Sequence, residues 1–230
     1  MTDRRGEPFF FYMSVILLLL VIGGFGSTLI TTTDAVLSRP PVVHVHGMIF
    51  MSWFLLYLLQ TRLIGSRNFV LHKRLGQLSI VLVSAMIVTG YLVTRIAFAT
   101  PGWSISGLPP ESSTIFPASD IVFFVIAFTL GLAFRANAAA HKRFMLLTGL
   151  LIMDPAIARL VINGLDGPLP LILLIELGLY VSIFVYDLRK YRRIHWATLI
   201  GFTLFVATTF LRMTQGEQTW WLSVSSKLFG

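Results

Sequence analysis

The stretch LHKRLG at residues 71–76 decides how this chain folds, because a near copy, HKRFM, follows at residues 141–145. Each copy places His-Lys-Arg at the start of a long apolar run, and His195 in RRIHW stands before a third run. In membrane proteins, Lys and Arg concentrate in the loops on the cytoplasmic side. The repeat therefore predicts a series of cytoplasmic turns, each followed by a helix that enters the membrane.

The composition is that of a polytopic membrane protein. Of the 230 residues, 56% are hydrophobic and 12% are charged, which is outside the range of soluble globular domains. A helix needs about 20 apolar residues to cross a hydrocarbon core of about 30 Å. Seven runs come close to this length and predict an all-α bundle of seven transmembrane helices: 9–30, 42–64, 75–98, 119–135, 143–163, 168–188 and 195–212.

The basic residues are distributed unevenly between the connections. The N-terminal segment and the loops around residues 60–74, 134–143 and 187–193 contain 13 of the 18 Lys and Arg residues. This bias predicts a cytoplasmic N-terminus and, after seven spans, a C-terminus outside. We therefore expect three parts, namely a cytoplasmic segment, a transmembrane domain and an interfacial tail on the outer face: 1–8, 9–212 and 213–230.

Several classes of protein lack support in this sequence. The chain contains no cysteine, which excludes disulfides, thiolate nucleophiles, cysteine-ligated metals and iron–sulfur clusters. It shows no Ser-His-Asp order and no Gly-rich phosphate loop, so a hydrolase or a nucleotide enzyme has no positive support. Because the positive charge follows the membrane topology, we expect the lipid bilayer as a partner and no nucleic acid.

Short motifs follow one another through the middle of the chain. They are HVHG, LQ, LHKRLG, TGY, HKRFM and PAIARL, within about residues 42–165. Together they resemble a family of bacterial multi-pass membrane proteins with H-R-x-x-G and H-R-x-x-M signatures before successive helices. That resemblance implies a protein of the bacterial inner membrane and no settled activity. LHKRLG is also similar to a stretch of transmembrane di-haem cytochromes b, which implies haem b as a candidate cofactor.

Ionisable residues inside the predicted spans mark a candidate ligand site. Such a side chain costs several kcal/mol unless it is paired or hydrated, and it usually faces the bundle interior. We expect an outer pocket for a small hydrophobic or anionic ligand, formed by His46, Arg95, Asp154, Arg159, Glu176 and Tyr180. The two arginines would bind the anionic group of that ligand. The alternative is an interhelical ion-pair network that only fixes helix packing.

Histidines provide a second set of candidates. In the second predicted span, helical spacing places one polar stripe on a single face, formed by His46, Trp53, Tyr57 and Gln60. His44 points about 200° away from His46 on a regular helix, so both cannot bind one ion. We expect His46, His72 and His141 as candidate ligands of haem or a metal ion. The alternative for His72 and His141 is a place at the membrane boundary without a ligand.

Three functions remain open from the sequence, and whether the protein is an enzyme is open with them. The first is a haem- or quinone-linked membrane redox protein, suggested by histidines near both membrane faces and by the cytochrome-like motif. The second is a non-enzymatic binding or transport protein for a small apolar or anionic molecule. The third is an accessory subunit of a membrane complex, whose lipid-facing surface contacts a partner protein.

Overall fold

The fold is an all-α bundle in the computed structural model, which describes residues 8–230. Six helices are long and apolar enough to cross a membrane: α1 (Pro8–Thr31), α3 (Pro41–Gly65), α4 (Phe69–Phe98), α6 (Ile115–Ala133), α9 (Pro170–Tyr191) and α10 (Trp196–Thr214). A bent pair meets the same criteria of length and composition when it is counted as one span, which gives seven: α7 (Ala138–Leu150) is followed by α8 (Asp154–Arg159) and the π-helical turn η1 (Leu160–Gly164). The prediction of an all-α polytopic bundle is confirmed.

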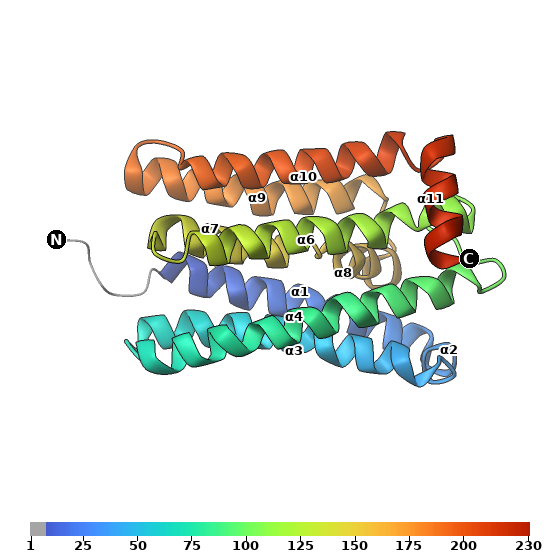
Figure 1. Ribbon diagram of the computed structural model, residues 1–230, viewed down its shortest axis with the longest axis horizontal. Coiled ribbons are helices and arrows are strands. Elements are labelled where there is room, and N and C mark those ends of the chain that lie inside the picture. Colours follow the sequence, from blue (N-terminus) through green and yellow to red (C-terminus); the bar gives the residue numbers. More distant parts are fainter. Residues whose placement is uncertain (1–7) are drawn as a thin grey trace.

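Short helices lie in the connections and in the tail. They are α2 (Thr33–Leu37), α5 (Pro110–Ser113) and α11 (Thr219–Phe229). The tail helix α11 lies across one end of the bundle (Figure 1). The indole nitrogen of Trp221 donates to the carbonyl oxygen of Glu111 at 3.1 Å. The Tyr91 hydroxyl donates to the backbone carbonyl oxygen of Leu228 at 2.9 Å. The tail is thus tied to α4 and α5, while its contact with the membrane surface stays a prediction.

Asparagine caps explain why two helices begin earlier than predicted. Asn68 accepts a hydrogen bond from the backbone N–H of Leu71, so α4 begins at Phe69 and not near residue 75. Asn137 accepts from the N–H groups of Ala139 and Ala140, so α7 begins at Ala138 and not near residue 143. Both His-Lys-Arg motifs therefore lie within the first turns of their helices.

The fifth predicted span, over 143–163, is not one continuous helix in the structure. The two parts of the span meet at an angle of 42°. Pro155 has no backbone N–H, and its ring conflicts with the carbonyl group four residues earlier, at Leu151. The break falls between Leu150 and Asp154 and places Asp154 in the first turn of α8.

The basic turns all lie at one end of the bundle. The start of α1 and the connections α3–α4, α6–α7 and α9–α10 share that end, as Figure 1 shows. The basic clusters that were counted along the sequence therefore meet in space at one membrane face, although Arg4 and Arg5 lie outside the described residues. The positive-inside rule predicts a cytoplasmic location for this basic end, which stays a prediction.

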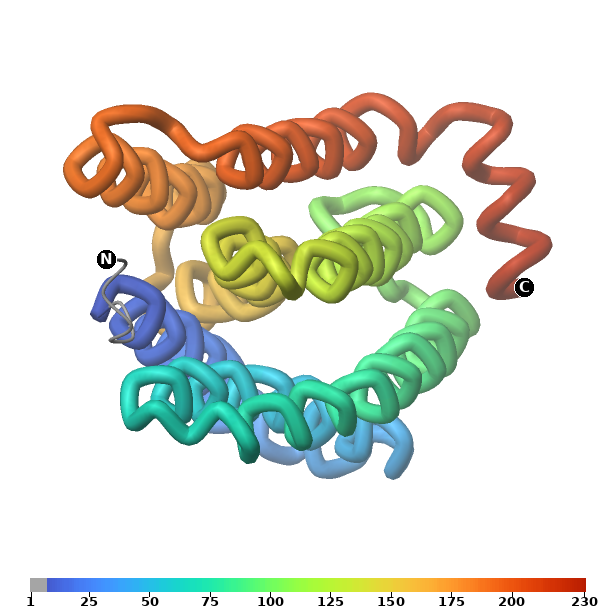
Figure 2. The backbone as a smooth tube through the Cα atoms, turned by 60° about the vertical axis from the view of Figure 1, so that its left-hand side comes forward, coloured from blue at the N-terminus to red at the C-terminus, as the bar shows by residue number. Residues whose placement is uncertain are grey.

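The centre of the bundle is built from α1, α6, α7 and α8, with α9 and α10 along one side and α3 and α4 along the other (Figures 1 and 2). Most of the least exposed large apolar side chains come from these central helices or from the break between α7 and α8: Leu17, Phe144, Leu147, Met153 and Ile157. Many large apolar side chains on the outer helices are exposed, as expected for surfaces that contact lipid. The broken span therefore lies inside the protein, where its free carbonyl groups can be satisfied.

A glycine allows α1 to approach α8 closely. A Cβ atom added at Gly24 would lie 2.1 Å from the carbonyl oxygen of Ala156. We expect Gly24→Ala to separate the two helices and to lower the free energy of unfolding by about 1–3 kcal/mol. Thermal unfolding in detergent checks this, with Gly26→Ala as the control because a Cβ at Gly26 meets no atom within 4 Å. Equal melting temperatures for the two variants would contradict the close approach.

Candidate functional site

Arg212 is the centre of a polar cluster inside the bundle. It lies in the last turn of α10, and its side chain is only 11% exposed. Its guanidinium forms an ion pair with Asp120 of α6 and a second one with Asp154 of α8, the latter at 3.2 Å. Its Nε donates to the Ser119 hydroxyl at 2.9 Å. One arginine therefore joins three elements that are distant in the sequence.

The helix α9 adds a third carboxylate and a tyrosine to this cluster. Glu176 lies close enough for the charges of Asp154, Arg212 and Asp120 to act on it. Among residues 8–230, Glu176 forms no hydrogen bond and no ion pair. Tyr180 follows one turn later, is 2% exposed, and has a hydroxyl group without a partner. We call Asp120, Asp154, Glu176, Tyr180 and Arg212 the Arg212 cluster.

Arg159 and His46 lie at the edge of the Arg212 cluster. Arg159 donates to the carbonyl oxygen of Pro155 at 2.8 Å, and its guanidinium lies 4.8 Å from the centre of the Phe25 ring. The charge of Asp154 acts on Arg159, and the charge of Arg159 acts on His46. His46 packs against Phe50 with 4.2 Å between ring centres. A chain of charged and polar groups therefore extends from the cluster to α3.

Arg95 does not join the predicted outer pocket. It lies in the last turn of α4, its side chain is exposed, and it forms no ion pair with any residue in the described part of the chain. Thr94 occupies the buried face of the helix at 3% exposure, and one residue further along an α-helix turns the side chain by about 100°. The expected anion site with both Arg95 and Arg159 stays a prediction, and the exposure of Arg95 does not support it. The structure brings together Asp154, Glu176 and Tyr180, with Arg159 and His46 nearby.

Asp120 and Arg212 were missed by sequence reasoning. Both lie at the ends of predicted spans, where a charge is ordinarily read as an interfacial residue. A signal existed, because Asp120 is the only acid of the run 119–135 and Arg212 the only arginine of the run 195–212. An ionisable residue within a predicted span is a functional candidate by default.

A second cluster lies toward the basic end and is fully paired. Arg143 of α7 and Asp187 of α9 form an ion pair with side-chain exposures of 1% and 0%. Thr198 of α10 donates to Asp187 at 2.6 Å and accepts from Nε of Arg143 at 3.2 Å. The backbone N–H of His195 also donates to Asp187, at 2.9 Å. Because these polar groups are satisfied, this cluster is a structural tie between α7, α9 and α10.

His195 caps α10 and makes its start sensitive to pH. Its Nδ1 accepts from the backbone N–H of Ala197 at 3.1 Å, which requires the neutral imidazole. Burial lowers the pKa of His195, and the charge of Arg143 lowers it further. The stabilisation of α10 by the His195 cap is therefore complete above about pH 6.5, the pKa of histidine in the unfolded chain. It is lost as the pH falls from there through the lower pKa of His195 in the folded protein.

We accordingly expect the Ala197 amide to exchange its hydrogen faster at about pH 5 than at about pH 7.5, after correction for intrinsic exchange. Hydrogen exchange followed by mass spectrometry measures this. His195→Asn is the matched control, because Asn also caps a helix but does not titrate in this range. A pH effect that persists in His195→Asn would contradict the assignment to the imidazole.

Two of the three predicted haem or metal ligands lie next to each other. The rings of His72 (α4) and His141 (α7) have centres 6.3 Å apart and planes at 87°. Nδ1 of His141 lies 2.8 Å from the carbonyl oxygen of Gly131, and the Gln60 amide donates to the carbonyl oxygen of His72 at 3.2 Å. His46 lies near the outer end of α3, far from this pair. Within residues 8–230, no group of three or more His, Asp or Glu side chains has the arrangement of a metal site.

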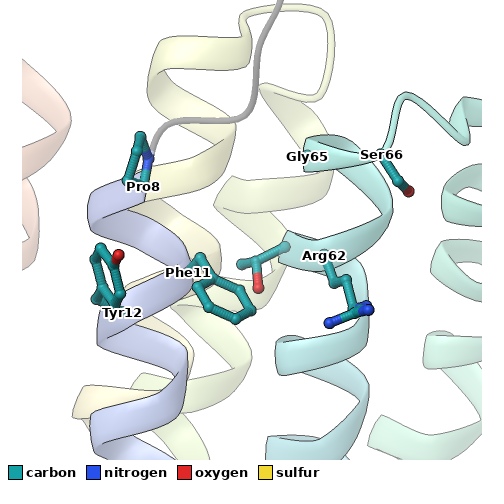
Figure 3. A pocket seen from close by; sticks show the side chains of 7 residues that line it. Pro8, Phe11, Tyr12, Arg62, Gly65 and Ser66 are labelled. Atoms are coloured by element: carbon teal, nitrogen blue, oxygen red, sulfur yellow. The ribbon is translucent and has the colours of Figure 1, made fainter.

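Two described cavities lie at opposite ends of the bundle. A cavity of about 370 Å³ opens between α1 and α3 at the basic end, lined by Phe11, Tyr12 and Arg62 among others (Figure 3). A smaller cavity of about 120 Å³ lies between α6, α10 and α11, lined by Trp220, Trp221 and Ser119 among others. Ser119 is also a partner of Arg212. The smaller cavity therefore borders the Arg212 cluster, and neither cavity is lined by a histidine.

Comparison of the chain with protein-family models, curated proteins and solved structures finds no match. The resemblance of the short motifs to a family of bacterial membrane proteins therefore stays a prediction. A functional conclusion has to come from the geometry of the two polar clusters and the histidine pair.

Proposed function

We propose that the protein is a non-enzymatic transport protein of the bacterial inner membrane that binds a proton at the Arg212 cluster and conducts it across the bilayer. One observation carries this proposal: three carboxylates of the bundle interior, Asp120, Asp154 and Glu176, converge on Arg212. Even when Arg159 is counted, one carboxylate lacks a cationic counterpart. An uncompensated charge inside the membrane costs several kcal/mol, and a bound proton removes that cost.

Glu176 is the proton-binding group in this proposal. Asp120 and Asp154 are both held by Arg212, whereas Glu176 has no ion pair among the described residues. The surplus of acidic groups also disfavours the anionic ligand considered from the sequence, because that ligand would add negative charge. A proton can reach the cluster from the outer end, where the smaller cavity borders Ser119.

Proton flux into lipid vesicles tests the proposed function. The purified protein is reconstituted into vesicles that contain a pH-sensitive dye, and a potassium diffusion potential, negative inside, drives protons inward. We expect acidification above the level of protein-free vesicles, and Glu176→Gln is expected to remove that excess. The matched control is Glu217→Gln, which changes an exposed acid outside the spans at the same end of the molecule.

Infrared spectroscopy examines proton binding separately from conduction. A protonated carboxylic acid has a C=O stretching band that a carboxylate lacks, and we expect this band in the wild type and its loss in Glu176→Gln. Flux equal to that of protein-free vesicles would overturn proton conduction. Absence of the carboxylic acid band would overturn Glu176 as the binding group.

A haem-linked redox protein is the second candidate, because His72 and His141 present two imidazoles 6.3 Å apart from different helices. Two axial imidazole nitrogens are a common way to hold the iron of haem b. Nδ1 of His141 is next to a carbonyl oxygen, which leaves its other nitrogen free for a ligand. The porphyrin, however, needs a slot between the helices, and the two described cavities lie elsewhere. His72 and His141 could supply ligands to the iron, but neither of the two described cavities adjoins them.

An absorbance spectrum distinguishes the two candidates. The proton-transport proposal expects no Soret band in protein purified from cells supplied with a haem precursor. A Soret band that shifts on reduction and disappears in both His72→Ala and His141→Ala would favour the redox protein instead.

A further inference from the structure

One face of α3 contains a row of buried polar atoms without partners. His46, Trp53, Tyr57 and Gln60 share this face, as the helical spacing predicts, and we call them the α3 stripe. Each has a buried polar atom that forms no hydrogen bond with any residue of the described range 8–230: Nδ1 of His46, the indole nitrogen of Trp53, the hydroxyl of Tyr57 and Oε1 of Gln60. Trp53 is 4% exposed and Tyr57 is 8% exposed.

Such a row is unusual in a folded protein. More than about 90% of buried polar groups have a hydrogen-bond partner, and each exception needs an explanation. Of the seven such side chains among the described residues, four follow one another on one face of α3. Buried water molecules satisfy groups of this kind when two or more polar partners surround them. The α3 stripe therefore has the chemistry of a hydrated path inside an otherwise apolar bundle.

The spacing of the α3 stripe fits a chain of water molecules. At a rise of about 1.5 Å per residue, the steps along the helix are about 10 Å from His46 to Trp53, about 6 Å to Tyr57 and about 4.5 Å to Gln60. Hydrogen-bonded oxygen atoms lie about 2.8 Å apart. Each step therefore needs only a few water molecules in a row.

The α3 stripe connects the two other polar sites of the molecule. At its outer end, His46 lies within reach of the charge of Arg159, which borders the Arg212 cluster. At its inner end, Gln60 donates to the backbone of His72, whose Nδ1 is also buried without a partner. The His72 ring lies beside His141 at the basic end of the bundle. The polar groups thus extend from one half of the membrane to the other.

Three side chains of the α3 stripe differ in whether they can pass on a proton. The His46 imidazole and the Tyr57 hydroxyl can each donate and accept a hydrogen bond, so both can pass a proton from one water molecule to the next. The Trp53 indole only donates, and it is held by edge-to-face contacts with Phe124 and Phe128 at 5.1 and 5.7 Å. Trp53 therefore orients water without accepting a proton.

We propose that the α3 stripe binds a chain of water molecules that conducts protons between the Arg212 cluster and the His72–His141 pair. The conduction part of this inference rests on the proposed function, whereas the hydration part does not. A proton that leaves Glu176 passes along hydrogen-bonded water molecules, is relayed by His46 and Tyr57, and reaches His72. Each relay group accepts one proton and releases another, so its own charge is unchanged after the step.

Exchange of the Trp53 indole hydrogen tests hydration directly. Protein with nitrogen-15-labelled tryptophan is transferred to deuterated buffer in detergent, and the indole signal of Trp53 is assigned by its loss in Trp53→Phe. Water contact predicts that this buried hydrogen exchanges on the timescale of the exposed Trp220 indole and shows a cross-peak to water. Protection for as long as core backbone amides would overturn the water chain.

Tyr57→Phe tests conduction, because it removes only the hydroxyl group. We expect vesicle proton flux to fall about tenfold, the change that the loss of one hydrogen bond from the path produces. The carboxylic acid band of Glu176 should persist. Tyr12→Phe is the matched control, since Tyr12 is 62% exposed on α1. Wild-type flux in Tyr57→Phe would overturn the path while leaving the proposed function intact. Absent flux in the wild type with rapid Trp53 exchange would overturn the proposed function and conduction, and would leave only the hydration of the α3 stripe.

Discussion

Arg212→Met is expected to destabilise the protein severely. The substitution preserves an unbranched side chain but removes the cation that holds Asp120 and Asp154 inside the bundle. Removal of one partner from a buried ion pair leaves an uncompensated charge, which costs about 3–5 kcal/mol. Part of this cost is relieved if the stranded carboxylates take up protons. We expect a large fall in melting temperature in detergent, together with a loss of the monodisperse peak in size-exclusion chromatography.

Two further variants make this result specific to the cluster. Arg95→Met removes an arginine of the same type from an exposed position without an ion pair in the described chain, and it should melt close to the wild type. In the Arg212→Met background, adding Asp120→Asn and Asp154→Asn removes the stranded charges and should restore part of the stability. If Arg212→Met alone melts like the wild type, the ion pairs do not hold α6, α8 and α10 together.

The fold could be predicted because membrane spans are mainly a property of local composition. Seven apolar runs indicated seven spans, and Pro155 explains the bend in the fifth because proline interrupts a helix. The early starts of α4 and α7 depended on Asn68 and Asn137, whose side chains cap the helices. These caps are also local features of the sequence. The span boundaries, however, were predicted from hydropathy, and a polar first turn of a helix does not count as part of an apolar run.

The site was harder to predict because it depends on rotation of the helices about their axes. The rule that intramembrane charges face inward correctly selected Asp154 and Glu176. The rule does not determine which helices are neighbours, so Arg95 was placed with them although Thr94 occupies the buried face. His72 and His141 had matching depth in the sequence, and only the packing of α4 near α7 brings their rings together. Convergence of four helices on Arg212 is a tertiary property with no local signature.

Asp187→Asn is expected to have the largest effect of all on stability. Asp187 accepts from Arg143, from the Thr198 hydroxyl and from the backbone N–H of His195, and its side chain is completely buried. The amide preserves the shape but removes the charge, which leaves the guanidinium of Arg143 buried at 1% exposure. The expected loss is at the upper end of the range of about 3–5 kcal/mol, because this pair is more deeply buried than the Arg212 pairs.

Two comparisons in thermal unfolding test whether the lost charge, and not the substitution at this position, causes the loss of stability. Asp166→Asn changes an exposed acid at a left-handed loop position that Asn tolerates, so it should be neutral. The double variant Arg143→Met with Asp187→Leu removes both charges and should be more stable than Asp187→Asn alone. Asp187→Asn should also retain the infrared band of a protonated Glu176 in whatever fraction remains folded, because the two clusters share no residue. A loss of that band in folded Asp187→Asn protein would show that the structural tie and the proton-binding site are one coupled network.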